Sequence, residues 1–207
     1  KSLEIRLKTL GTNHPSVAWS YINLSDFHNS KGDYDKAIIY STKALEIQSK
    51  TLDVQHRDMA SPYFSLGSSY YLKSNNEKAI EYYQKALEIQ LKTLGSEHPD
   101  LAHSYMGLGA SHHSKKEYKT AIEYFRKALE IQLKIFGVKH PNIAWSYNGL
   151  GVTYEAIGKY DEAIDCFQKA LMSCDFANGD YSKVNSLEHL LHGFNCLSIT
   201  LETNYNL

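Results

Sequence analysis

The residues best suited to chemistry in this 207-residue chain are histidines, and two groups of them have the spacing of metal ligands. Residues three or four apart on a helix lie on one face, where they can hold a zinc ion or support hydrolysis. The groups are His103, His112 and His113 in one segment, and His189, His192 and Cys196 in another. Neither group has a carboxylate partner specified by the sequence. We therefore favour packing or solvation for both groups, and expect no metal and no cofactor.

Two further patterns that could bind phosphate or perform acid–base catalysis are interpreted as structural. Gly107-Leu-Gly and Gly149-Leu-Gly fall inside predicted helices, and they lack the strand and the Lys-Ser/Thr step of a phosphate-binding loop. Carboxylates such as Glu123, Glu130 and Asp165 have lysines nearby, as ordinary surface pairs do. We find no catalytic residues and predict that the protein is not an enzyme.

Composition and charge narrow the class of protein. The chain has 43% hydrophobic residues and a net charge of −1, from 22 Lys+Arg against 23 Asp+Glu. Without a basic excess, nucleic acid is not an expected partner. No apolar run approaches the roughly 18 residues of a membrane span, and the chain's start lacks the apolar block of a secretory signal. No membrane partner is therefore expected. The three cysteines have no CxxC spacing, which favours a reducing, cytoplasmic setting.

A fixed period organises most of the chain. His14, His56, His98 and His140 follow one another at intervals of 42 residues. The phrase KALEIQLKTLGSEHPDLA at 85–102 returns as KALEIQLKIFGVKHPNIA one period later. Such a period is typical of a stacked array, in which each unit buries its apolar face only against its neighbours.

Each copy divides into two amphipathic segments, which we predict to be helices. In copy three they are residues 99–114 and 118–137, separated by a polar turn. The first segment begins after a His-Pro step, where the missing N–H of proline costs nothing, although copy two has Arg57 there and should start more loosely. The second segment ends at Gly95 or Gly137, because glycine tolerates the left-handed conformation just past a helix end.

Conserved spacing inside copies two and four resembles the tetratricopeptide repeat. The matching residues are Tyr63, Leu66, Gly67, Tyr70, Ala79, Tyr83 and Ala86 in copy two, and Tyr147, Leu150, Gly151, Tyr154, Ala163, Phe167 and Ala170 in copy four. The common repeat has about 34 residues. The longer unit, with its ALEIxxKxLGxxHPxxA phrase, is similar to the kinesin light chain and nephrocystin-like class. Copy one departs at Ser25, His28 and Ser41, where we expect looser packing.

The resemblance implies an all-α fold, an α-solenoid in which antiparallel helix pairs form a right-handed superhelix. We expect a single array over residues 1–207. Its predicted parts are the second helix of a truncated preceding repeat at 1–13, repeats at 14–55, 56–97, 98–139 and 140–181, and a degenerate first helix acting as a cap at 182–207. The ends of such an array could support self-association.

The resemblance also implies a concave wall made by the first helices. Positions at i, i+3, i+7 and i+10 outside the packing set supply its residues, with Ser61 and Ala110 among them. The predicted peptide-binding groove comprises Trp19, Ile22, Asp26, Asn29, Phe64, Ser68, Tyr71, His103, Met106, His113, Trp145, Asn148, Val152 and Glu155. None is Lys or Arg, so the basic clamp by which some family members grip a carboxylate tail is absent. The pattern leaves open whether Trp19 and Trp145 face the groove or pack between neighbouring first helices.

Three functional hypotheses follow from these observations. The favoured one is a non-enzymatic protein-interaction scaffold, part of a longer adaptor, that binds a peptide or partner helix in its groove. The alternative is a sensor or regulatory arm of a larger multidomain ATPase or signalling protein. The third is a metal-dependent or hydrolytic activity of the histidine groups.

Overall fold

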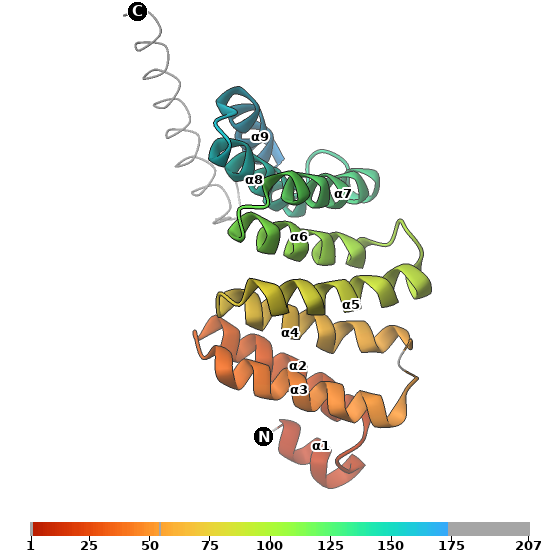
Figure 1. Ribbon diagram of the computed structural model, residues 1–207. Helices are drawn as coiled ribbons and strands as arrows, with labels where there is room; N and C mark the ends of the chain where they lie inside the picture. The colour runs from red at the N-terminus through yellow and green to blue at the C-terminus, as the bar shows by residue number, and fades with distance from the viewer. Residues whose placement is uncertain (1, 54, 174–207) are drawn as a thin grey trace, which may run out of the picture. The chain divides into compact units, whose positions relative to one another are not determined.

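The chain folds into helices throughout the part that the computed structural model describes, residues 2–53 and 55–173 (Figure 1). It divides into two compact units, residues 1–111 and 112–207, and each is described by itself. The predicted cap at 182–207, with His189, His192 and Cys196, lies outside the described residues. Within those residues the all-α class expected from the sequence is confirmed.

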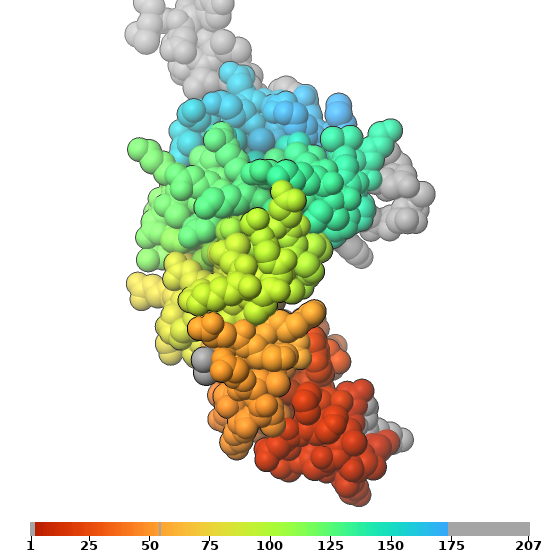
Figure 2. Space-filling view, turned by 90° about the vertical axis from the view of Figure 1, so that its right-hand side faces the viewer, coloured from red at the N-terminus to blue at the C-terminus, as the bar shows by residue number. Residues whose placement is uncertain are grey.

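The first unit contains the first helices of copies one to three and the second helices of copies one and two, preceded by one shorter helix. In chain order the elements are α1 (Ser2–Leu10), α2 (Pro15–Ser30), α3 (Tyr34–Thr51), the 3₁₀ turn η1 (Arg57–Met59), α4 (Ala60–Leu72), α5 (Asn76–Leu94) and α6 (Pro99–Ser114), whose last turn passes the boundary of the unit. Helix α2 packs on α3 and α4 packs on α5, and α4 also contacts α2 and α3. In the space-filling view of Figure 2, α3 in orange and α4 and α5 in yellow to yellow-green form successive layers.

The described part of the second unit contains α7 (Tyr118–Phe136), α8 (Pro141–Ala156) and α9 (Tyr160–Ser173). Helix α8 packs against both α7 and α9. The pairs α2–α3, α4–α5 and α8–α9 each fall inside one of the 42-residue copies, although the exact repeat boundaries stay a prediction.

The recurring histidine is a helix cap. At each of its four positions the ring Nδ1 accepts a hydrogen bond from the backbone N–H two residues later, which satisfies one of the free donors at a helix start. The pairs are His14 with Ser16 at 3.1 Å, and His56 with Asp58, His98 with Asp100 and His140 with Asn142 at 3.2 Å. The period of 42 residues therefore marks the start of each first helix.

Copy two begins its first helix differently from the others. Three copies start directly with an α-helical turn at Pro15, Pro99 and Pro141, whereas copy two has the 3₁₀ turn η1 before α4. Proline at position 62 lacks the N–H that an α-helix beginning at Arg57 would need there. Copy two therefore starts irregularly, at the copy where Arg57 replaces the proline of the others.

The second helices end where glycine permits a left-handed backbone. Gly95 follows α5 with φ of 81°, and Gly137 follows α7 with φ of 69°. Other residues rarely adopt such a φ without strain. Helix α3 lacks this glycine, and its chain leaves at Leu52 in an extended conformation.

An aromatic ring on a second helix packs between two glycines, one on the first helix of its own copy and one on the first helix of the next copy. Tyr83 of α5 is buried, and a Cβ added at Gly67 of α4 would lie only 2.7 Å from its ring. A Cβ at Gly107 of α6 would meet the same ring. In the second unit, Phe125 lies against Gly149 in the same way, so the size match predicted from the sequence is present in both units.

Copy one replaces this aromatic joint with serines. Ser41 stands where Tyr83 stands one period later, and its Oγ donates to Ser25 at 2.6 Å and is bonded to Ser65 at 2.9 Å. Ser25 and Ser41 are completely buried. Three short hydroxyl groups replace one ring and two glycines here, and they satisfy one another.

Candidate functional site

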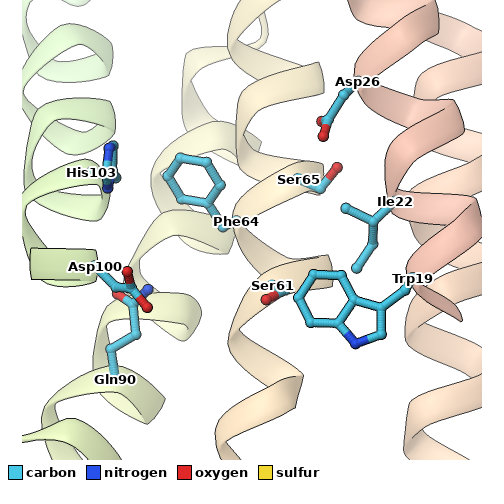
Figure 3. Close-up of a pocket in the computed structure, with 9 residues that line it drawn as sticks. All are labelled: Trp19, Ile22, Asp26, Ser61, Phe64, Ser65, Gln90, Asp100 and His103. Carbon is cyan, nitrogen blue, oxygen red and sulfur yellow. The ribbon is translucent and has the colours of Figure 1, made fainter. Parts of the chain in front are cut away.

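A hollow of about 260 Å³ opens between the first helices of the first unit (Figure 3). Helices α2 and α4 supply most of its wall, and α5 and α6 supply the rest. Its lining residues are Trp19, Ile22, Asp26, Ser61, Phe64, Ser65, Gln90, Asp100 and His103. Five of the predicted groove residues, Trp19, Ile22, Asp26, Phe64 and His103, therefore meet at one place, together with Ser61 of the same predicted wall.

The two tryptophans that the sequence left open do not belong to the core. Trp19 is 44% exposed and forms one side of the hollow, while Trp145 in the second unit is 49% exposed. Ile22 also lines the hollow and is buried. An exposed indole on the same hollow as a buried apolar side chain offers a large contact area with little conformational entropy to lose on binding.

Phe64 lines the hollow, and its ring packs against two neighbouring rings. Its ring centroid is 5.4 Å from that of Tyr83, in a tilted arrangement, and 6.5 Å from that of His103, edge to face. These spacings are typical of favourable aromatic pairs. The ring is therefore fixed in place and only half-buried, with one side available to a partner.

The hollow borders the serine joint of copy one. Ser65 lines the hollow and is also hydrogen-bonded to Ser41, the residue that replaces the aromatic ring of the other copies. In copy two the corresponding ring, that of Tyr83, lies against the positions of Gly67 and Gly107. The side chain of Ser41 is much shorter than such a ring, so no ring from position 41 lies beside Ser65.

The charge of the hollow is negative. Asp26 and Asp100 both line it, and no lysine or arginine does. Although the Asp26 side chain reaches solvent, desolvation by its surroundings raises the pKa of its carboxyl group above the ordinary value. Asp26 forms no ion pair with any residue in the described part of the chain. Asp100 is exposed, and its carboxylate lies 3.7 Å from Nδ1 of His98.

The remaining predicted groove residues of the first unit lie outside the hollow. Asn29 donates a 3.0 Å hydrogen bond from Nδ2 to Ser69, and its Oδ1 is buried without a partner. Ser68, Tyr71 and Met106 are half-buried. Asn29 thus supports the helix packing beneath the face.

The predicted residues of the second unit lie on α6 and α8. His113 is half-buried, its Nδ1 is 3.0 Å from Thr153 Oγ1, and desolvation lowers its pKa. Trp145 is exposed, whereas the others on α8 are half-buried. These others are Asn148, Val152 and Glu155.

Three lining residues were missed by the sequence analysis. They are Ser65 and Gln90, which are buried, and Asp100, which lies in the first turn of α6. Gln90 accepts a 2.7 Å hydrogen bond from Ser104. The signal that could have found Ser65 was the joint departure of Ser25, Ser41 and Ser65 from the pattern of the later copies.

The histidines proposed as metal ligands have other surroundings. His112 stacks on Tyr124 at 5.4 Å between ring centroids, and its Nδ1 contacts Glu117. His103 belongs to the hollow. Within residues 2–53 and 55–173 no three His, Cys, Asp or Glu side chains are placed to hold one metal ion. In the same ranges no helix is long and apolar enough to cross a membrane.

This chain is similar to several solved structures and to one family model. No curated protein matches its sequence. Among solved structures, BtubC (BKLC) from P. vanneervenii is similar, with a TM-score of 0.79 and 21% identity over 94% of this chain and 78% of that one. TPR-like repeats attributed to a kinesin light chain of Podosopora anserina are similar with a TM-score of 0.75 and 23% identity, over 93% and 92% of the two chains.

The apo form of RapI is also similar, with a TM-score of 0.72 and 21% identity over 91% of this chain and 65% of that one. At these identities the solved structures show the fold, an α-solenoid of helix pairs like that of kinesin light chain-type repeats. The sequence model of the tetratricopeptide repeat matches residues 1–50, 24–92, 58–134 and 102–172. The chain therefore belongs to the tetratricopeptide repeat family.

Proposed function

We propose that the chain is a non-enzymatic interaction scaffold that binds an extended peptide or a partner helix on the face of its first helices. Repeats of this family generally mediate protein–protein interaction. The observation that carries the finer proposal is the hollow in the first unit, with the exposed indole of Trp19 beside the fixed ring of Phe64. Aromatic anchors of this kind dominate the energetics of protein interfaces.

The hollow supports binding rather than catalysis. Nucleophilic catalysis requires a serine or cysteine hydrogen-bonded to a base. Ser65 instead bonds Ser41 and Ser25, and His103 forms no hydrogen bond to Ser61 or Ser65 in the described structure. A volume of about 260 Å³ is also below the range of about 300–1,000 Å³ usual for small-molecule sites.

Selection of peptide ligands tests the proposal directly. A phage library of random twelve-residue peptides is selected on the immobilised chain, and the affinities of enriched peptides are measured by fluorescence polarisation. We expect Trp19→Ala to weaken binding by about tenfold or more, as truncation of an aromatic anchor does. Ile39→Ala is the matched control, since Ile39 is an exposed apolar residue on the second helix α3.

The two variants show whether the peptide binds on the face of the first helices or elsewhere on the surface. Binding that falls with Trp19→Ala and not with Ile39→Ala supports the proposal. Binding that is insensitive to Trp19, or a failure to enrich any peptide, would overturn it. Circular dichroism on both variants checks that neither substitution has changed the helical content.

A further inference from the structure

We propose that the hollow of the first unit receives a lysine or arginine side chain of the bound peptide, so that partners carry a basic residue at one fixed position. This inference rests on the proposed function, because it specifies the ligand of the same face. The inference is argued from four residues that line the hollow, namely Asp26, Asp100, Trp19 and Phe64.

Charge complementarity favours a cation. Asp26 and Asp100 line the hollow from α2 and α6, on opposite sides in Figure 3, and no lysine or arginine accompanies them. Elsewhere on the surface, carboxylates are commonly paired within the chain, as Glu81 is with Lys85 at 2.6 Å and Asp165 with Lys169 at 2.6 Å. The carboxylate of Asp26 has no such partner among the described residues.

The contact of Asp100 with His98 leaves the carboxylate available. Nδ1 of His98 accepts the hydrogen bond of the Asp100 backbone N–H at 3.2 Å, so this nitrogen carries no proton while the cap is formed. The carboxylate, 3.7 Å from the same atom, therefore gains no hydrogen bond from it. An incoming ammonium or guanidinium group would supply the missing donor.

The walls suit the rest of a basic side chain. Lysine and arginine have long aliphatic stems that pack on apolar surface while the charged head contacts polar groups. Ile22 and Phe64 supply that surface, and the exposed ring of Trp19 is the type of ring on which cations bind best. An acidic side chain would instead face two carboxylates without a compensating cation.

The size and position of the hollow point to a single side chain. Its volume is about 260 Å³, and Ser65, which is bonded to Ser41, lines it. The desolvation that raises the pKa of Asp26 is in accord with this, since a cation bound beside the carboxyl group would stabilise its charged form. The hollow therefore binds the side chain of one residue of a longer peptide.

The test uses peptides enriched from the random library on the full chain. We expect them to share one Lys or Arg position, and replacing that residue by norleucine should weaken binding to the native chain by about tenfold, as loss of a close interfacial charge pair does. The same replacement should have little effect on binding to the Asp26→Asn, Asp100→Asn double variant. Glu46→Gln, which removes one exposed negative charge from α3 of the same unit, should leave the tenfold effect intact.

A charge exchange provides the second measurement. Asp26→Lys should lose the basic peptide and gain affinity for the peptide in which the basic residue is glutamate. Enriched peptides that depend on Trp19 but share no basic position, or whose basic residue acts equally with and without the two carboxylates, would overturn the inference and leave the scaffold function standing. Peptides that are insensitive to Trp19→Ala would overturn both.

Discussion

Ser104 donates a 2.7 Å hydrogen bond from its hydroxyl to Oε1 of Gln90, which joins α6 to the preceding second helix. One period earlier, the place of the serine is taken by Pro62, which has no hydroxyl. Both polar atoms of the completely buried Gln48 lack a partner, and Oε1 lacks the bond that the serine hydroxyl gives Gln90. An unsatisfied buried amide costs about 1–3 kcal/mol, so the contact between copies one and two carries a local defect.

Gln48→Met should therefore raise the free energy of unfolding, by about 1–3 kcal/mol, because it removes the unpaired amide and keeps the side-chain volume. Urea unfolding followed by circular dichroism measures the change. Gln132→Met is the matched control, and it should lower the stability because Ser146, now bonded to Gln132 at 2.7 Å, would lose its partner. Effects of the same sign at both positions would contradict the argument.

The serine joint predicts strong coupling between three positions. Ser41→Tyr alone should destabilise the chain by about 1–3 kcal/mol, because the ring has no room beside the side chains of Ser25 and Ser65. Adding Ser25→Gly and Ser65→Gly reproduces the arrangement around Tyr83 and should recover most of the loss. Thermal unfolding of the single, double and triple variants gives the coupling, and additive effects would show that the three residues do not form one unit.

The same triple variant should also close the hollow. Since a ring at position 41 would occupy the space beside Ser65, peptides selected on the native chain should bind the triple variant more weakly while its helical content is unchanged. Binding at native affinity would mean that the peptides do not enter the hollow.

Asp26 should make stability depend on pH in a defined direction. Its folded-state pKa is raised by desolvation, so the stabilising form is the protonated one, and its contribution is lost as the pH rises through the folded pKa. Asp26→Asn should thus be more stable than the native chain at pH 7, by less than about 1 kcal/mol for so exposed a group, and equal to it near pH 3. Asp165→Asn, which breaks the ion pair with Lys169, should show no gain at pH 7.

Cys166 should resist alkylation in the folded chain. Burial raises the pKa of its thiol to about 11, so only about one molecule in a thousand carries the reactive thiolate at pH 8. Peptide mapping after iodoacetamide treatment should show labelling of Cys166 in 6 M guanidinium at least about a hundredfold faster than in buffer. Equal rates would place the thiol at the surface.

The repeat period and the spacing of small and aromatic residues were enough to predict the helices and their approximate ends. The structure adds the reason for the period, since His14 and His140 each cap the same helix start in their copies. The grouping of Trp19, Ile22 and Phe64 was predicted from helical spacing together with the family resemblance, because residues on one face of α2 and α4 remain neighbours when the helices pack.

The hollow itself could not be predicted in this way. Its wall includes Ser65, which is bonded to Ser41 of another helix, and its charge depends on Asp100, which lies on a third helix. Spacing along one helix carries no information about either. The unpaired state of Gln48 was hidden for the same reason, because it depends on a proline fourteen residues away.

The contrast between the ring of Tyr83 and the serines of copy one implies an uneven resistance to force. Pulling α4 away from α6 would expose a large aromatic surface that water solvates poorly, whereas parting α2 from α4 would expose hydroxyl groups whose bonds water can replace. Under tension on the first unit, the chain would yield first at the serines. The hollow that lies there would then be the earliest feature to disappear as the molecule is stretched.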